Sequence, residues 1–200
     1  MAGASTAPAK RVLVPVAAGS EEIEAVCLVD TLRRAAFDVT VAGVGSDGPL
    51  TMSRGIVLVP DCSIESAAEA ARAAPFDLVL LPGGMPGASG LAASEPLLGI
   101  LRAQRDGSRW YGAICAAPAV VLLPNGLLPE GEPATCHPAF MDKLPEATRT
   151  EDRVVVNTKH RVITSRGPGT AIEMALAAIA AVGGDERAAS VAGPMLVART

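Results

Sequence analysis

The sequence predicts an α/β fold in which helices pack on both sides of a mainly parallel β-sheet. Short runs rich in Val, Ile and Leu alternate with amphipathic stretches along most of the 200 residues. Several of these runs are continuously apolar, as in strands that are buried on both faces of a sheet. No repeat, low-complexity linker or shift of composition divides the chain. We therefore expect one domain over residues 10–200, preceded by a flexible tail of residues 1–9.

Six segments carry the strand pattern, and the spacing between most of them leaves room for a helix. The expected strands are 11–16, 38–42, 77–81, 111–114, 153–156 and 161–164. Residues 50–60 interrupt the alternation and predict a small β-hairpin insertion.

Helical patterns fill the longer gaps, at residues 21–35, 63–74, 95–105 and 170–182. In the first helix Ile23, Val26, Val29 and Leu32 recur every three residues, so we expect this stripe to face the core. Ligands of such sheets bind beyond the carboxyl ends of the strands, so the loops that follow strands are the candidate sites.

Composition excludes several classes of protein. Half of the residues are hydrophobic, 19% are charged and the net charge is −4, which excludes a disordered chain and a nucleic-acid-binding basic surface. No apolar run approaches the roughly 20 residues of a membrane-spanning helix. The first nine residues lack the apolar segment of a secretory signal, and the four cysteines include no C-x-x-C pair. We expect free thiols and a cytoplasmic location, with import into an organelle left open.

Cys115 is the first candidate for chemistry. It follows the strand 111–114 and is flanked by small residues, as a sharp strand-to-helix turn that exposes a nucleophile requires. The positive end of the following helix is expected to lower the pKa of this thiol. A buried structural cysteine is the alternative, because that is the commonest environment of a free Cys.

Glu24 lies in the first turn of the helix 21–35, together with Glu21 and Glu22. Acidic side chains are common at this position because they complement the helix dipole, and for Glu21 and Glu22 we expect no further role. Glu24 follows Ile23 and borders the expected apolar stripe, so its carboxyl should be partly desolvated. A protonated carboxyl there can donate a hydrogen bond to a thiolate.

The strand 77–81 leads into Pro82-Gly83-Gly84, where paired glycines let backbone N–H groups approach a ligand and hold an oxyanion. The dinucleotide-binding pattern G-x-G-x-x-G fits only loosely and does not follow the first strand, so no such site is expected. His137 forms a possible pair with Cys115, whereas adjacent Cys136 leaves metal binding as an alternative. Metal is not favoured, because strand neighbours point to opposite faces and no second ligand pair exists.

Five segments together resemble the DJ-1/PfpI superfamily, in order and in spacing. They are Gly-Ser-Glu-Glu-Ile-Glu (19–24), Leu-Pro-Gly-Gly (81–84), Ala-Ile-Cys-Ala-Ala-Pro (113–118), His-Pro (137–138) and Thr-Ser-Arg-Gly-Pro-Gly-Thr (164–170). The resemblance covers residues 10 to 198 and is closest to the branch that includes the parkinsonism-associated proteins.

The resemblance implies a flavodoxin-like three-layer sandwich that forms a homodimer and uses no cofactor and no metal. It implies that Cys115 is an oxidisable nucleophile, hydrogen-bonded to Glu24. Backbone N–H groups of Gly84 and Ala116, beside Gly83, would form the anion pocket. The resemblance further implies that His137 is the nearby site histidine, and that Arg34 and Arg54 lie around the site near the dimer contact.

Protease-like members of the superfamily have His directly after the nucleophile, whereas this chain has Ala116, so peptidase activity is not expected. The lid segments of chaperone-type members are also absent. The resemblance implies a glyoxalase or deglycase that converts small reactive aldehydes such as methylglyoxal and glyoxal to 2-hydroxy acids. A redox sensor or chaperone of oxidative stress, in which Cys115 becomes a sulfinate, is the alternative. Hydrolysis of glutamine by an amidotransferase-like mechanism is a third hypothesis, which the sequence supports less than the other two.

Overall fold

The computed structural model describes residues 8–197, which contain a seven-stranded sheet in the order β5-β2-β1-β6-β7-β9-β8. Neighbouring strands run parallel, except that β8 pairs with β9 in the antiparallel sense. The strands are β1 (Arg11–Ala17), β2 (Asp38–Val44), β5 (Cys62–Ser63), β6 (Leu78–Leu81), β7 (Trp110–Ile114), β8 (Val154–Asn157) and β9 (Val162–Ser165). The predicted α/β class and mainly parallel sheet are confirmed.

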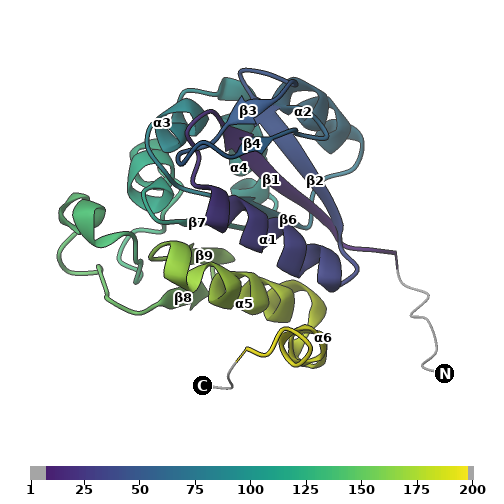
Figure 1. Cartoon of the computed structure of the whole chain (residues 1–200). Helices are drawn as coiled ribbons and strands as arrows, with labels where there is room; N and C mark the ends of the chain where they lie inside the picture. The colour runs from purple at the N-terminus through teal and green to yellow at the C-terminus, as the bar shows by residue number, and fades with distance from the viewer. Residues whose placement is uncertain (1–7, 198–200) are drawn as a thin grey trace.

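Helices cover both faces of this sheet, so the fold has three layers (Figure 1). One layer holds α1 (Glu22–Arg34), α5 (Ala171–Gly183) and α6 (Asp185–Ala192), of which α5 contacts the other two. The opposite layer holds α2 (Ile64–Ala73) and α4 (Glu95–Asp106), which pack together. The short helix α3 (Gly87–Ala92) follows β6 and packs near β1.

The predicted hairpin is present as β3 (Leu50–Thr51) and β4 (Val57–Leu58), which pair in the antiparallel sense outside the main sheet. Elements that the sequence did not predict include β5, α3, α6 and three segments between β7 and β8. These segments are the π-helix η1 (Pro118–Leu122) and the 3-10 turns η2 (Leu123–Asn125) and η3 (Pro138–Lys143). Another 3-10 turn, η4 (Pro168–Thr170), precedes α5.

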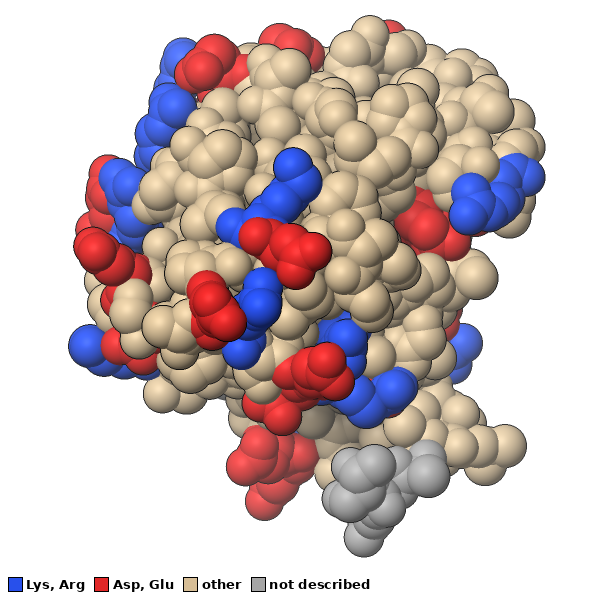
Figure 2. All heavy atoms as spheres, turned by 90° about the vertical axis from the view of Figure 1, so that its left-hand side faces the viewer, with Lys and Arg blue, Asp and Glu red and all other residues tan. Residues whose placement is uncertain are grey.

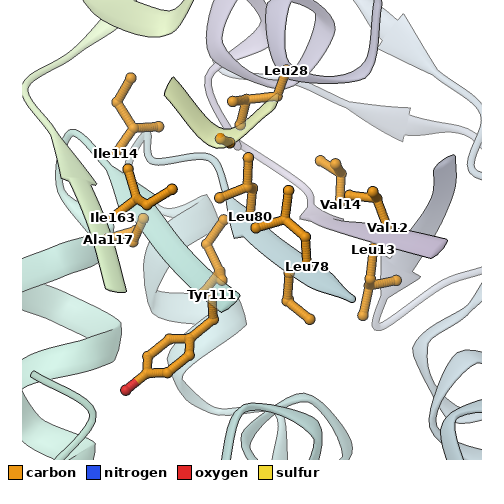
Figure 3. Packing of buried hydrophobic residues seen from close by; sticks show 14 of the residues in the cluster. Val12, Leu13, Val14, Leu28, Leu78, Leu80, Tyr111, Ile114, Ala117 and Ile163 are labelled. Carbon is orange, nitrogen blue, oxygen red and sulfur yellow. The ribbon is translucent and has the colours of Figure 1, made fainter. Parts of the chain in front are cut away.

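The core is built from apolar side chains on both faces of the central strands (Figure 3). Leu28 of α1 lies over the sheet on one side, and Tyr111 of β7 points to the other side, where its hydroxyl donates to the carbonyl of Leu127 at 2.8 Å. Central strands of a parallel sheet are buried on both faces, which explains their continuous apolar sequences.

The expectation about the buried face of α1 is wrong for Ile23 and Val26, whereas Leu32 is buried and Val29 packs against the core as expected. Ile23 and Val26 are 53% and 48% exposed. The buried positions include Glu24, Leu28 and Leu32, which lie four residues apart and point to the sheet and α5. Because the buried stripe passes through Glu24, this carboxyl lies inside the molecule and Ile23 and Val26 lie on its surface.

The parallel register brings three strand ends to one edge of the sheet. Leu81 at the end of β6 pairs with Ala113 of β7, and Ile114 of β7 pairs with Ser165 of β9. Since these strands run in the same direction, the Gly83 loop, Cys115 and the residues after Ser165 meet at their carboxyl ends.

On the face shown in Figure 2, acidic and basic side chains are interspersed and separated by uncharged areas. No extended basic area is visible on that face. Within residues 8–197, no helix is long and apolar enough to cross a membrane. Of the expected tail, residues 1–7 lie outside the described residues.

Candidate active site

Cys115 occupies a backbone conformation that non-glycine residues rarely adopt, with φ at +64° directly after β7. Both of its backbone groups are fixed. Its N–H donates to the carbonyl of Ser165 at 3.0 Å, and its carbonyl accepts from the N–H of His137 at 2.8 Å. Such a conformation costs about 1–3 kcal/mol and persists only where the surroundings enforce it, which is typical of functional sites.

The glycine loop packs directly on this turn. A Cβ at Gly83 would lie 2.6 Å from Cβ of Cys115 and 2.8 Å from the carbonyl oxygen of Ile114, so no larger residue fits. Gly84 has φ at +83°, and its N–H, like that of Ala116, is directed at the Cys115 sulfur. Two backbone donors therefore converge on the reactive atom, as in an oxyanion hole.

Glu24 approaches the same sulfur from α1. Its side chain is fully buried, its Oε2 accepts the N–H of Gly83 at 2.7 Å, and its carboxyl is in hydrogen-bonding contact with the Cys115 thiol. Its other oxygen, Oε1, is buried without a hydrogen-bond partner. The first turn of the helix is anchored by Glu21, whose carboxylate accepts the N–H of Glu24 at 2.7 Å. The helix thus delivers one carboxyl to the thiol.

Burial sets the acidity of this carboxyl. Desolvation raises the pKa of Glu24 to about 7, against hydrogen bonds from Gly83 and Cys115 that lower it, and the charge of Glu21 raises it further. Glu24 therefore holds its proton through most of the acidic range, as the sequence predicted. A protonated carboxyl beside sulfur donates a hydrogen bond to it, which stabilises a thiolate.

Burial also dominates the acidity of the thiol, which is opposite to the expectation from the helix dipole. Desolvation raises the pKa of Cys115 to about 12, and the negative charge of Glu24 acts in the same direction. The N–H groups of Gly84 and Ala116 lower it, but only the short π-helix η1 and a 3-10 turn follow. A thiolate at Cys115 thus depends on a proton at Glu24, and the two groups share one negative charge.

His137 borders the site. It caps the turn η3, where its Nδ1 accepts the N–H of Ala139 at 3.2 Å, so in a neutral ring Nε2 carries the proton. A Cβ at Gly167 would lie 3.4 Å from Cδ2 of His137 and 4.0 Å from Oε1 of Glu24. Gly167 therefore separates the histidine from the buried acid, and the absence of its side chain keeps this space open.

Within one chain, the two arginines lie apart from this cluster. Arg34 is exposed in the last turn of α1, where its Nε donates to Asp30 at 2.7 Å. Ten residues separate it from Glu24, which is about 15 Å along a helix. Arg54 is exposed in the hairpin, and its backbone N–H donates to Oε1 of Glu22 at 2.6 Å. Arg54 is thus connected to the site helix, whereas Arg34 lies at its far end.

Sequence reasoning missed two contributors. Glu22, expected to be a charged helix start only, is 3% exposed and accepts the hydroxyl of Ser53 at 2.6 Å as well as the N–H of Arg54. These bonds lower the pKa of Glu22 and fix the hairpin to α1. Gly167 was named only within the family segment 164–170, with no role of its own, and in the structure it lies between His137 and Glu24. For Glu22, only the neighbouring hairpin explains burial, which no local pattern reveals.

Cys136 is fully buried and packs near Met141, with 3.6 Å between the two sulfurs, whereas His137 is half-buried and faces the site. The two neighbours therefore point apart. Among residues 8–197, no group of three or more His, Cys, Asp or Glu side chains is arranged to hold a metal ion.

Comparisons with known proteins place this site in context. Residues 10–181 match the DJ-1/PfpI family. Protein DJ-1 homolog A of Arabidopsis thaliana is 46% identical over 187 residues, which cover 94% of this chain and 46% of the relative. This chain spans less than half the length of that relative. The Parkinson disease protein 7 homolog of Danio rerio is 40% identical over 189 residues, which cover 94% of this chain and 97% of the relative.

A third relative, from Caenorhabditis elegans, is described as glutathione-independent glyoxalase DJR-1.2. It is 36% identical over 182 residues, which cover 90% of this chain and 92% of the relative. The solved structure described as Toxoplasma gondii DJ-1, oxidized, has a TM-score of 0.88 and 43% identity, covering 96% of this chain and all of the other. Fold, sequence and the residues at the strand ends agree: the chain belongs to the DJ-1/PfpI family.

Proposed function

We propose that this protein converts α-oxoaldehydes such as methylglyoxal and glyoxal to 2-hydroxy acids without a cofactor. One observation carries the proposal: a buried carboxyl, Glu24, with a pKa raised to about 7, contacts the sulfur of Cys115 in a turn of positive φ. The name of the C. elegans relative, glutathione-independent glyoxalase, supports the same reaction.

In the first step, the thiolate of Cys115 attacks the aldehyde carbon, and a C–S bond forms as the carbonyl π bond breaks. Its oxygen gains negative charge, which the N–H groups of Gly84 and Ala116 stabilise. Glu24 gives its proton to this oxygen, which yields a hemithioacetal and a carboxylate. The proton that Glu24 held while Cys115 was a thiolate is thereby transferred to the substrate oxygen.

In the second step, the Glu24 carboxylate removes the proton from the former aldehyde carbon, and the electron pair forms an enediol. The hydroxyl proton on the former aldehyde oxygen passes to the former ketone oxygen, and Glu24 returns its own proton to the adjacent carbon, which leaves a thioester of the 2-hydroxy acid. Water then hydrolyses the thioester, releasing the acid and restoring the thiol. No net oxidation takes place. Proton transfer by a positioned group contributes typically ~10²–10⁴-fold in rate.

His137 is positioned to assist in binding or proton transfer, since the N–H of its Nε2 is not used in capping η3. Repair of early glycation adducts, the deglycase reading, uses the same atoms. Removal of free aldehyde that is in equilibrium with an adduct gives the same products.

The alternative is a redox sensor, in which peroxide oxidises Cys115 to a sulfinate without essential turnover. The same donors, Gly84, Ala116 and protonated Glu24, would hold the sulfinate oxygens. In the sensor, Glu24 needs only to donate a hydrogen bond to the sulfinate, whereas the glyoxalase reaction needs Glu24 to give up and regain a proton. This difference separates the two functions experimentally.

We further propose a homodimer, as the family resemblance implies. Its support is the apolar surface of α1 and the hairpin, where Ile23, Val26, Val57 and Val59 are between 48% and 66% exposed. A cavity of about 290 Å³ lies between these elements, lined in part by Val26 and Val59. Exposed apolar patches rimmed by polar groups are typical of protein interfaces. Arg54, held beside Glu22, would lie near the contact.

We propose a cytoplasmic location.

The direct test incubates the protein, with Cys115 reduced, with methylglyoxal and measures lactate. We expect lactate in stoichiometric excess over protein, and none above buffer from Cys115→Ser. Feeding glutamine and measuring ammonia tests the glutaminase reading. If the wild type forms no lactate, the glyoxalase function is wrong and the sensor remains.

A further inference from the structure

A second cavity, of about 370 Å³, opens beside the active site. We name it the Arg166 cavity. It is lined by His137, Pro138, Arg153, Arg166, Gly167, Pro168, Gly169 and Thr170. Gly167, which lines this cavity, also lies next to Glu24: a Cβ at Gly167 would be 4.0 Å from Oε1 of Glu24. A group bound at Cys115 and Glu24 would therefore extend its substituent past Gly167 into this cavity.

The cavity is larger than the proposed reaction needs. Binding pockets of drug-sized ligands begin at about 300 Å³, whereas methylglyoxal has only a methyl group beyond its two carbonyls. The walls are more apolar than polar, but they include two arginines and a histidine. The volume and the donors together indicate a longer substituent that accepts hydrogen bonds.

Only one of the two arginines is available for a ligand. Arg153 is neutralised by Glu173, whose carboxylate it binds through Nε at 2.8 Å and Nη2 at 2.5 Å, and Nη2 also donates to the carbonyl of Gly169. Arg166 is held less completely. Its Nη1 donates to the backbone carbonyl of Glu151 at 3.0 Å, and the Glu151 carboxylate, 88% exposed, lies 3.9 Å away.

The Nε of Arg166 is buried without a hydrogen-bond partner. An unsatisfied donor of a charged group is costly in a folded protein, and it gains most from an acceptor that carries charge. Because Glu151 is largely in solvent, its attraction is screened and weak. The lining therefore includes one cation with an unused N–H at Nε.

The loop that carries Arg166 is fixed before any ligand binds. Thr170 Oγ1 accepts the N–H groups of Arg166 and Gly167 at 3.2 and 3.1 Å, and it lies 2.7 Å from the hydroxyl of Ser165. Ser165 in turn accepts the N–H of Cys115 through its carbonyl. Preorganisation of this kind lowers the entropy cost of binding.

We propose that the Arg166 cavity is a substrate subsite that selects α-oxoaldehydes whose substituent ends in a carboxylate. A planar carboxylate matches the fork of a guanidinium, and a single negative charge matches the single free cation better than a dianion. His137 lines the same cavity, and its Nε2, which is not used in capping η3, is available as a further donor. This inference rests on the proposed function for its chemistry, but binding at the subsite is measured separately.

The test compares an acid with its neutral ester. The unreactive probes are 4-oxopentanoate and its methyl ester, with affinities measured by isothermal titration calorimetry. The reactive pair is 4,5-dioxopentanoate and its methyl ester, compared by kcat/KM. We expect the acid to be preferred about 10-fold or more in both measurements, because a charged hydrogen-bonded pair replaces a neutral contact.

Variants assign the preference to one residue. Arg166→Gln should remove the preference for the acid, and Arg166→Lys, which keeps the charge but not the fork, should reduce it. Arg102→Gln is the matched control, since Arg102 lies on α4 and pairs with Glu95 at 3.2 Å. The control should keep the wild-type preference.

Equal affinity of the wild type for acid and ester, or no measurable binding of the acid, would overturn the subsite. So would a full preference in Arg166→Gln. If both aldehydes are turned over without preference, the subsite proposal is wrong and the glyoxalase function is retained. If the acid binds in a manner that depends on Arg166 but neither aldehyde is turned over, the subsite is retained and the glyoxalase function is wrong.

Discussion

The N–H of Gly83 donates a 2.7 Å hydrogen bond to Oε2 of Glu24, and the same glycine packs against the side chain of Cys115. One residue thereby fixes the distance between a carboxyl from α1 and a thiol from the end of β7. The bond leaves Oε1 of Glu24 free to act on the sulfur or on a substrate.

Gly83→Ala tests this packing. The added Cβ would lie 2.6 Å from that of Cys115, so the turn or the loop has to move, at a cost of about 1–3 kcal/mol in the free energy of unfolding. We expect lower stability in urea and slower alkylation of Cys115. Gly99→Ala, on α4 with nothing within 4 Å of its Cβ, is the control and should gain about 0.5–1 kcal/mol. A stable Gly83→Ala protein with wild-type Cys115 reactivity would contradict the packing.

Glu24→Gln tests the proton transfer. Gln can donate a hydrogen bond to sulfur but cannot give up and regain a proton, so we expect kcat for methylglyoxal to fall by ~10²–10⁴. Glu65→Gln, an exposed carboxylate in the first turn of α2, should leave kcat unchanged. Oxidation of Cys115 to sulfinate should survive in Glu24→Gln. Unchanged lactate formation in this variant would remove Glu24 from the mechanism.

The buried acid also predicts a pH dependence of stability. Its pKa is about 7 in the fold and 4.5 in the unfolded chain, so between these pH values only the folded state holds the proton. Stability therefore decreases as pH rises from 4.5 to 7, by roughly 3 kcal/mol from this group alone. Urea unfolding across this range should show the decrease in the wild type relative to Glu24→Gln. A constant difference between the two proteins would show that the Glu24 pKa is not raised.

Val26→Asp tests the proposed dimer. A charge at the centre of the apolar surface of α1 and the hairpin would be desolvated in the interface, so we expect a monomer in sedimentation analysis where the wild type is a dimer. Val156→Asp, on the edge strand β8 and 39% exposed, is the control and should remain dimeric. A monomeric wild type would reject the dimer outright.

Much of the sheet could be predicted because its central strands are continuously apolar. The orientation of α1 could not be predicted, because Ile23 and Val26 are as apolar as the residues that reach the core. Spacing alone does not distinguish a stripe that packs on the sheet from one left for another surface. The observed stripe, Glu24, Leu28 and Leu32, contains a carboxyl, and an apolar pattern does not select it.

Cys115 and Glu24 could be selected from the sequence, and the structure places the two side chains in contact, while their chemical roles stay a prediction. The pKa of the Cys115 thiol could not be predicted from the sequence. A helix start after Cys115 suggested an acidified thiol, whereas the cost of burying the sulfur is larger and depends on packing from β6, α1 and β9. The roles of Glu22 and Gly167 depend on neighbours more than 30 and more than 100 residues away in sequence.

The pH dependence of Cys115 alkylation by iodoacetamide tests the shared charge of Cys115 and Glu24 most directly. The pair loses its first proton near pH 7, and in those singly charged pairs that keep the remaining proton on Glu24 the sulfur is a thiolate, so the wild-type rate should show a first rise with a midpoint near 7, below the pKa of about 8.5 of free cysteine. Ionisation of the thiol beside a charged Glu24, where its pKa is raised to about 12, should give only a second rise at high pH. In Glu24→Gln the thiol ionises without a partner that takes up the charge, and its midpoint should move to higher pH. A first wild-type midpoint at or above 8.5, or the same first midpoint in both proteins, would contradict the account.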